Sequence, residues 1–292
     1  MIAVTNITHV EHVMGTAVTF EVVPGTVASA TVDEAVSAAC TMLHDVDDVF
    51  SLWKDNSPMS RLRRGEVDQP DVPLEIGEVL LACETMRQMT GGWFDARRMP
   101  GGVDPTGYVK GWAVQRALDV LRDCGVEAAL VNGGGDAAAF GWPSAHRPWR
   151  LGVRDPKSVS GLVGIVALEP ALDERIALAT SGTYERGEHL IDPATGRPAT
   201  SDVSSASVLG PDLAVADALA TALAAGGRAC ASVLDAPGYS GLLLHADGTR
   251  TVIGHFRLLP MPSYSAAGIP PFASTSAAAA PASAPAAPAP SR

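Results

Sequence analysis

The stretch "DLAVADALATALAAGG" (residues 212–227) joins a run of Ala and Leu to a paired-glycine end and carries two oxygen-bearing side chains, Asp217 and Thr221. Paired glycines are typical of a helix stop. Asp217 and Thr221 stand four positions apart, so they project from one face of the predicted helix. Two interpretations fit this spacing. Either Asp217 lies near the helix start and Thr221 bonds back to a carbonyl one turn earlier, or the two side chains form half of a site for a hard cation that also binds phosphate.

The composition predicts a globular protein. The chain has 292 residues, of which 47% are hydrophobic and 18% are charged, and its formal net charge is −11. This length supports one large domain or two closely packed subdomains. The negative charge gives no electrostatic support for a nucleic-acid or anionic-membrane surface, so we expect no nucleic-acid partner.

The cysteines predict neither a zinc site nor a disulfide framework. They have no C-x-x-C spacing, and no His stands at ligand distance from any of them in the sequence, so we expect small core residues. The four are Cys40, Cys83, Cys124 and Cys230.

The two ends of the chain differ in character. The opening "MIAVTNITHVEHVMGT" has no basic segment followed by an apolar one, and no apolar run approaches ~18 residues, so we expect no membrane span and a cytoplasmic location. From Leu258 to Ser291 there is no charged residue, and Ala, Pro and Ser dominate. This predicts a folded domain over residues 1–257 and a solvated tail over 258–292. The oligomeric state stays open.

The pattern of elements predicts an α+β fold, because strands come in runs between helices instead of alternating with them. The segment 15–23 alternates as a strand does, and a Thr-x-x-Glu capping box starts a helix at residue 31. A polar turn is expected over 51–65. The remaining predictions are helices over 73–92 and 108–126, and strands over 127–132, 149–153, 162–167, 176–180, 205–209 and 241–254.

Seven short motifs follow one another along the chain. They are "MGT" (14–16), "SLWKDNSPMSRL" (51–62), "TGGWFD" (90–95), "VDPTGYVKGWAVQRA" (103–117), "VNGGGD" (131–136), "ATSGTYERGEHLIDPATGRP" (179–198) and "ADALATAL" (216–223). Each is weak alone; "VNGGGD", for example, reads as a tight turn or as a backbone approach to phosphate. In this order, over residues 10–255, the set resembles the FAD:protein FMN transferase (ApbE) family.

The resemblance implies an ApbE-like fold, with FAD bound between two closely packed α+β subdomains. It also implies a Mg²⁺-dependent reaction that cleaves FAD, attaches FMN by a phosphoester bond to a Thr or Ser hydroxyl of an acceptor protein, and releases AMP. Two alternatives remain open. One is an FAD pyrophosphatase that yields FMN and AMP, and the other is a protein that binds FAD without catalysis.

The resemblance also implies roles for individual residues. The metal ligands are Asp217 and Thr221, with the carbonyl of Gly107 and the carbonyl of Ala220 as a further ligand. Lys110 neutralises charge on the pyrophosphate, and His189 is the candidate base for the acceptor hydroxyl, with Asp217 as its competitor. The residues implied to contact FAD are Met14, Trp53, Trp93, Phe94, Asp95, Asp104, Lys110 and Ile191.

Some positions depart from the family pattern. In "DPTGYVKG", where the family has "DLGGIAKG" or "DLSAIAKG", Pro105 and Tyr108 are unusual. Thr183 replaces the Asp of "SGDY", and Arg63 stands where an Asn is usual. None of these changes removes an implied metal ligand. They bear on the details of the pocket and on the choice of partner.

Overall fold

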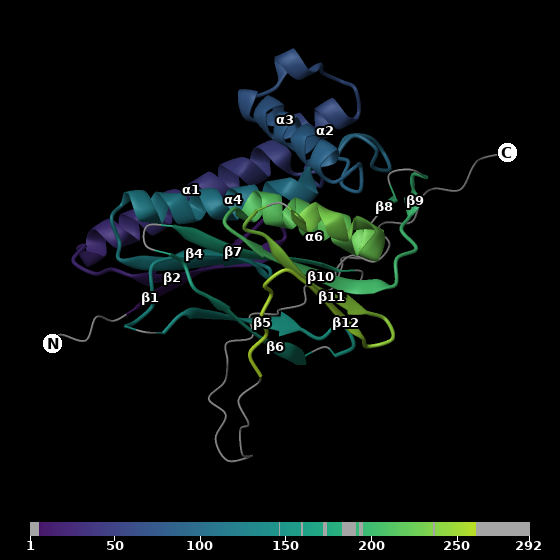
Figure 1. Cartoon of the computed structure of the whole chain (residues 1–292). Helices are drawn as coiled ribbons and strands as arrows, with labels where there is room; N and C mark the ends of the chain where they lie inside the picture. Colours follow the sequence, from purple (N-terminus) through teal and green to yellow (C-terminus); the bar gives the residue numbers. More distant parts are fainter. Residues whose placement is uncertain are drawn as a thin grey trace. The chain divides into compact units, whose positions relative to one another are not determined.

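The computed structural model describes residues 6–145, 147–158, 160–171, 174–182, 191–192, 195–235 and 237–260. These residues form an antiparallel eight-stranded sheet with helices on one face and a small hairpin on the other (Figure 1). The predicted α+β class is therefore confirmed. Since one sheet runs through the described residues, the division into two subdomains with FAD between them stays a prediction.

The strands of the main sheet pair antiparallel throughout, in the order β1-β2-β3-β4-β7-β10-β11-β12. Their bounds are Ile7–Val13 (β1), Thr16–Val23 (β2), Ala128–Gly133 (β3), Asp136–Phe140 (β4), Arg175–Gly182 (β7), Val203–Gly210 (β10), Ser240–His245 (β11) and Arg250–Ile253 (β12). Successive side chains point to opposite faces, so Val131 contacts the helices while Leu130 contacts the hairpin.

Three long helices, α1 (Ser29–Phe50), α4 (Thr106–Asp123) and α6 (Leu213–Gly226), cover one face of the sheet (Figure 1). Their apolar stripes share one core with the strands below. Between α1 and α4 lie α2 (Pro58–Arg63), the 3₁₀ turn η1 (Gln69–Asp71) and α3 (Leu74–Met89). A 3₁₀ segment, η2 (Gly227–Asp235), follows α6.

The opposite face is covered by the hairpin β5 (Trp149–Arg154) and β6 (Leu162–Leu168). Trp149 and Leu168 of this hairpin are buried in a second apolar cluster against Leu130 and Leu178 of the sheet. A separate two-stranded pair joins β8 (Ile191–Asp192) to β9 (Arg197–Pro198). Both faces of the sheet are therefore closed to water over its centre.

The structure corrects several local predictions. Helix α1 begins at Ser29, before the predicted capping box, and its N-cap residue Ala28 provides no side-chain cap. The turn predicted over 51–65 contains α2, which Ser57 caps by accepting the N–H of Ser60. The strand predicted over 241–254 is the β11–β12 hairpin. Strands β1 and β4 were missed because histidines and alanines gave no clear apolar alternation.

The ordered chain continues past the predicted domain end at residue 257. Leu259 pairs with Ile165 of β6 in both directions, with N···O distances of 3.1 and 2.8 Å, so backbone pairing with the sheet layers reaches two residues past the predicted boundary. Residues 261–292, the rest of the predicted tail, lie outside the described residues.

One segment of the described chain, Leu213–Asp235, is long and apolar enough to cross a membrane by length and composition. Within the fold, 72% of its apolar window is buried against other elements. Core helices also meet this criterion of length and apolar composition, because they are apolar on all sides. The segment is α6 with η2, and α6 packs on strands β7 and β10 and against α4.

Candidate active site at the junction of helices α4 and α6

Helices α4 and α6 approach closely at Gly111. A Cβ atom at this position would lie 2.6 Å from the carbonyl oxygen of Leu213 and 3.0 Å from Cβ of Asp217, so no larger residue fits without movement. The N–H of Gly111 donates to Oδ2 of Asp217 at 3.1 Å. Asp217 is only 2% exposed. Its carboxylate is thus a buried group held in place by the backbone of the other helix.

A second contact fixes the start of α6 against α4. Gln115 of α4 accepts the N–H of Leu213 at 2.7 Å and donates to Oδ2 of Asp212 at 2.9 Å. Asp212 in turn caps α6 by accepting the N–H of Val215 at 2.9 Å. These bonds satisfy amides that the first turn of a helix leaves without a partner. They set the axial position of α6, and with it the positions of Asp217 and Thr221.

Thr221, one turn beyond Asp217, faces the start of α4. Its Oγ1 would lie 3.3 Å from a Cβ built on Gly107. Its hydroxyl lies 3.2 Å from Oγ of Ser181 on β7, and either hydroxyl can donate in this hydrogen bond. Asp217, Thr221 and Gly107 therefore lie at one junction. Both interpretations of the Asp217–Thr221 pair stay predictions.

The carbonyl of Gly107 is the regular helical acceptor for the N–H of Gly111, four residues later. Because that N–H donates to Asp217, and because a carbonyl oxygen has two lone pairs, Gly107 has capacity for another partner. Ala220 is fully buried next to this junction. Its carbonyl lies inside α6, where the N–H of Ala224 is the regular donor. The ligand roles of both carbonyls stay predictions.

Lys110 pairs with a carboxylate that the sequence analysis did not select. Its Nζ lies 2.6 Å from Oδ2 of Asp136, whose side chain is fully buried, while Lys110 itself is 22% exposed. The other carboxylate oxygen of Asp136 accepts the N–H of Thr180 at 2.8 Å. Asp136 follows the glycines of "VNGGGD" and starts β4. This pair holds the ammonium one turn along α4 from Gly107.

Asp104 organises the loop that enters α4. Its Oδ1 accepts both the N–H and the hydroxyl of Thr106, at 3.0 and 2.6 Å. Its Oδ2 accepts from Arg63, the residue that replaces the usual Asn, at 3.2 Å. Arg63 also donates to the carbonyls of Pro100 and Gly101. Arg63 thus ties this loop to α2, which gives the unusual residue a structural role.

Phe94 and Trp93 pack onto the same two helices. Phe94 is buried, donates its N–H to Oγ1 of Thr90 at 3.0 Å, and lies 3.4 Å from a Cβ built on Gly107. Trp93 packs on the end of α6, where a Cβ on Gly226 would lie 2.6 Å from its ring. Phe94 therefore borders the junction at Gly107, and Trp93 contacts α6 at its C-terminal end.

The other residues that the sequence assigned to FAD are less closely linked to the junction. Asp95 accepts the N–H of Arg97 at 2.9 Å, which makes it a turn-forming residue. Met14 lies in the β1–β2 turn with a φ of 52°, and Gly15 beside it has a φ of 71°. Trp53 is 92% exposed, so most of its ring surface is open to solvent.

Two predicted residues are not fully described. His189 lies outside the described residues, and only the backbone of Ile191 is described, in β8. Their roles stay predictions.

Tyr108, the unusual residue of "DPTGYVKG", is partly buried in the first turn of α4 and packs against the main core. Burial, with a smaller contribution from Asp212, raises the pKa of its phenol to about 12. Its hydroxyl is therefore neutral at physiological pH and is a poor candidate for a base.

Sequence reasoning missed Asp136, Ser181, Gln115 and the close approach at Gly111. Asp136 and Ser181 both stood inside quoted motifs, "VNGGGD" and "ATSGTYERGEHLIDPATGRP", so the motifs contained a signal. The motifs did not show which residue each side chain would contact, because each contact joins residues that are tens of positions apart in the sequence. The sequence gives no sign that Gln115 has a buried partner. Its contact with the N–H of Leu213 depends on where α6 lies in the fold.

The chain is similar to one known protein family and to individual proteins with known names. The ApbE family model matches residues 14–101 and 97–243. The chain is 41% identical over 134 residues to the FAD:protein FMN transferase of Rhodobacter capsulatus, an alignment that spans 43% of this chain and 24% of that protein. It is 32% identical over 166 residues to the FAD:protein FMN transferase of Treponema pallidum, spanning 50% of this chain and 44% of that protein. The matches thus span less than half the length of these relatives.

Solved structures agree with the fold. The flavin transferase ApbE from Vibrio cholerae superposes with a TM-score of 0.70 at 23% identity, covering 85% of this chain and 97% of that one. The ApbE protein of Thermotoga maritima gives the same TM-score, identity and coverage. At such identity the likeness establishes the fold alone. The family match spans most of the chain and includes every element of the α4–α6 junction, and we conclude that this protein belongs to the ApbE family.

Proposed function

We propose that this protein is a Mg²⁺-dependent FAD:protein FMN transferase. In this reaction an acceptor Thr or Ser oxygen attacks the phosphorus on the FMN side of the FAD pyrophosphate. The bond from that phosphorus to the bridging oxygen breaks, AMP leaves with the electron pair, and the hydroxyl proton goes to a base. The observation that carries the proposal is the convergence of Asp217 and Thr221 on Gly107 where α4 meets α6.

The donor set at this junction suits Mg²⁺. A carboxylate, a hydroxyl and a backbone carbonyl are all hard oxygen ligands, which Mg²⁺ prefers together with phosphate oxygens and water. The N–H of Gly111 orients the carboxylate of Asp217, and the hydroxyl of Ser181 orients that of Thr221. When bound, Mg²⁺ neutralises phosphate charge and acts as a Lewis acid on the pyrophosphate. Asp217 supplies the negative charge among the protein ligands.

Lys110 provides positive charge near the same phosphates. An ammonium carries three donors, so the pair with Asp136 is compatible with a contact to pyrophosphate oxygens. The buried carboxylate of Asp136 holds the lysine in one position, and this reduces the cost of ordering it when the substrate binds. Charge that develops on the leaving AMP is then met by a cation already in place.

Flavin and acceptor contacts complete the proposal. Met14, Phe94 and Ile191 supply apolar contacts to FAD, and Asp104 keeps the loop before α4 in position. His189 is the proposed base, since an imidazole titrates near neutral pH. The acceptor is a protein that presents a Thr or Ser hydroxyl.

The test is incubation of the purified chain with FAD and Mg²⁺, with and without candidate acceptor proteins. AMP release that requires acceptor, together with a flavin mass on a Thr or Ser of that acceptor, supports a transferase. AMP release without acceptor identifies a pyrophosphatase instead. FAD binding with no AMP under either condition identifies a binding protein and overturns the proposal. Chelation of Mg²⁺ with EDTA is the matched control and should stop AMP release.

A further inference from the structure

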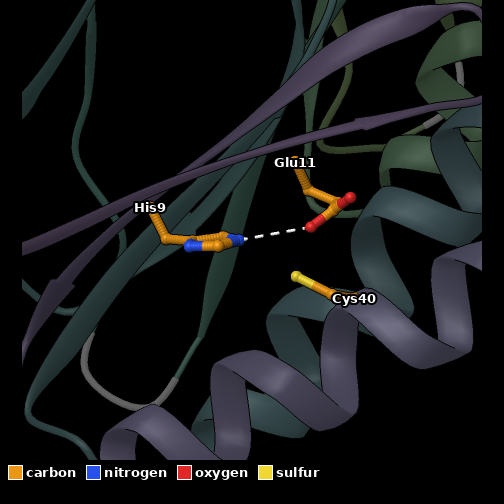
Figure 2. A group of neighbouring side chains, drawn as sticks. All are labelled: His9, Glu11 and Cys40. Carbon is orange, nitrogen blue, oxygen red and sulfur yellow. Dashed lines mark hydrogen bonds and ion pairs between the residues drawn. The ribbon is translucent and has the colours of Figure 1, made fainter.

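A cluster of metal-ligating side chains lies away from the α4–α6 junction, between the edge strand β1 and helix α1. His9 and Glu11 project from β1 toward Cys40 of α1, and Figure 2 shows the three side chains facing one another. Their ligand atoms all lie within 4.8 Å of one another. Cys40 is a core residue, as its sequence context predicted, but the fold brings His9 close to it from another element, a contact that the spacing of the sequence did not show.

Polar residues occupy core-facing positions here. Ile7, His9, Glu11 and Val13 alternate on the side of β1 that faces α1, and the two outer members of this row pack against the main core. His9 and Glu11 interrupt that apolar row. On α1, Cys40 belongs to the buried stripe. If this side of β1 served only for packing, apolar side chains would be expected at both positions. The presence of His9 and Glu11 therefore indicates a chemical role.

The groups already interact. Nε2 of His9 lies 3.4 Å from Oε2 of Glu11, and Nε2 of His44 lies 3.0 Å from Oε1 of the same carboxylate. His44 stands one turn after Cys40, on the neighbouring face of α1. Glu11 is thus held between two imidazoles, one from its own strand and one from the helix.

The donor types match a thiophilic transition metal. Zn²⁺ binds imidazole nitrogen, carboxylate oxygen and thiolate sulfur at about 2.0 to 2.3 Å, so neighbouring ligand atoms around a tetrahedral ion lie about 3.3 to 3.6 Å apart. The His9–Glu11 separation already has this value. Even for the widest pair, the approach needed is only about 1 Å, and a thiolate and a carboxylate together balance the charge of a divalent ion.

We propose that His9, Glu11 and Cys40 bind one thiophilic divalent ion such as Zn²⁺, and that His44 positions the carboxylate of Glu11. Three protein ligands leave a fourth position for water or an outside ligand. The hydrogen bond from His44 fixes which carboxylate oxygen faces the ion, as second-sphere partners do at known metal sites. Hard Mg²⁺ is disfavoured here because it prefers oxygen ligands alone.

The position of this site between β1 and α1 predicts a structural effect of the bound ion. β1 forms one edge of the sheet, so it has a strand partner, β2, on one side only. An ion shared by β1 and α1 would cross-link this edge to the helix layer. It would join Cys40 to His9 and Glu11, which lie 31 and 29 positions before it in the sequence. Since metal bound to the folded state stabilises it, Zn²⁺ should raise the melting temperature.

The experiment is titration of the full chain with Co²⁺, which reports a cysteine ligand through a thiolate-to-cobalt charge-transfer band. We expect one Co²⁺ per chain, this band, and its displacement by Zn²⁺. Cys40→Ser should abolish the band, and His9→Gln and Glu11→Gln should weaken binding more than tenfold. His44→Gln should weaken it by about 10- to 100-fold while the band is kept, since this residue acts through Glu11.

Matched controls come from the same elements. His12→Gln, on the opposite face of β1, and Cys124→Ser, a partly exposed thiol just after α4, should leave Co²⁺ binding unchanged. Asp217→Asn should also leave it unchanged, which separates this site from the proposed Mg²⁺ site. Absence of the band in the unmodified chain, or binding that survives Cys40→Ser with the band intact, would overturn the proposal. Circular dichroism of each variant verifies that it is folded.

Discussion

The N–H of Gly111 donates to Oδ2 of Asp217 at 3.1 Å, across 106 positions of sequence. This bond fixes a buried carboxylate of α6 against the backbone of α4, beside Gly107 and Thr221. The same glycine allows the two helices to approach, because a Cβ there would meet the carbonyl of Leu213 at 2.6 Å. One small residue therefore controls both the packing of two helices and the position of the proposed metal ligand.

Gly111→Ala should destabilise the protein by about 1 to 3 kcal/mol, because the added methyl overpacks the contact between α4 and α6. It should also weaken Mg²⁺ binding in the presence of FAD, since Asp217 must shift. Urea unfolding and calorimetry measure the two effects.

The matched control for this variant is Gly77→Ala in α3. A Cβ at Gly77 makes one ordinary contact at 3.6 Å, to Gln69, so helix propensity should dominate and raise stability by about 0.5 to 1 kcal/mol. A Gly111→Ala protein that is as stable as the Gly77→Ala protein would show that the helices have room at their crossing.

Asp217→Asn should leave the fold intact and remove metal dependence. The amide oxygen of Asn can still accept the N–H of Gly111, so the helix contact is kept while the charge on the ligand is lost. We expect a melting temperature near that of the unmodified protein and Mg²⁺ affinity reduced at least about tenfold. Calorimetric titration of Mg²⁺ with FAD present is the measurement. Unchanged affinity would remove Asp217 from the ligand set.

Lys110→Met should destabilise the protein by about 3 to 5 kcal/mol, because it leaves the buried carboxylate of Asp136 without its cation. The double variant Lys110→Met/Asp136→Asn should recover much of that stability, since no buried charge remains. FAD turnover should stay low in both, because the cation proposed to face the pyrophosphate is missing. Recovery of turnover in the double variant would restrict Lys110 to a structural role.

Met14→Asn separates strain from flavin contact. Met14 is the one non-glycine residue with a positive φ among the described ranges, a conformation that costs a residue of this kind on the order of 1 kcal/mol, and which Asn tolerates well. Stability should therefore stay within about 1 kcal/mol of the unmodified protein, since relief of strain offsets the lost packing. FAD affinity should fall by about tenfold, the equivalent of roughly 1.4 kcal/mol. A large loss of stability with unchanged FAD affinity would assign Met14 to packing alone.

His189→Gln tests the proposed base. A base for a hydroxyl nucleophile contributes about 10²- to 10⁴-fold to rate, so transfer to an acceptor should fall by about two orders of magnitude while FAD affinity and melting temperature stay near those of the unmodified protein. Single-turnover rates at saturating FAD and acceptor, measured across a range of pH, separate chemistry from binding. A variant that keeps more than about a third of the rate would direct attention to Asp217 instead.

The sequence by itself determined the features that depend on neighbouring residues. The strand at Thr16–Val23 follows from alternation, and the end of α4 follows from Gly125, whose φ is 85°. The helix at 212–227 ends at its paired glycines, with Asp217 and Thr221 on one face, as their spacing predicted. Ordered motifs also identified the family. Such signals are local, because the periodicity of apolar side chains and the backbone conformation depend on consecutive residues.

Only the tertiary structure decided which distant residues meet. The pairing of Lys110 with Asp136, and the approach of His9 to Cys40, depend on the order of strands in the sheet and on how the helices pack over it. No spacing in the sequence encodes these contacts, since each polar side chain is compatible with many partners until burial selects one. Burial makes that choice because a charged or polar group removed from water must find a partner inside the fold.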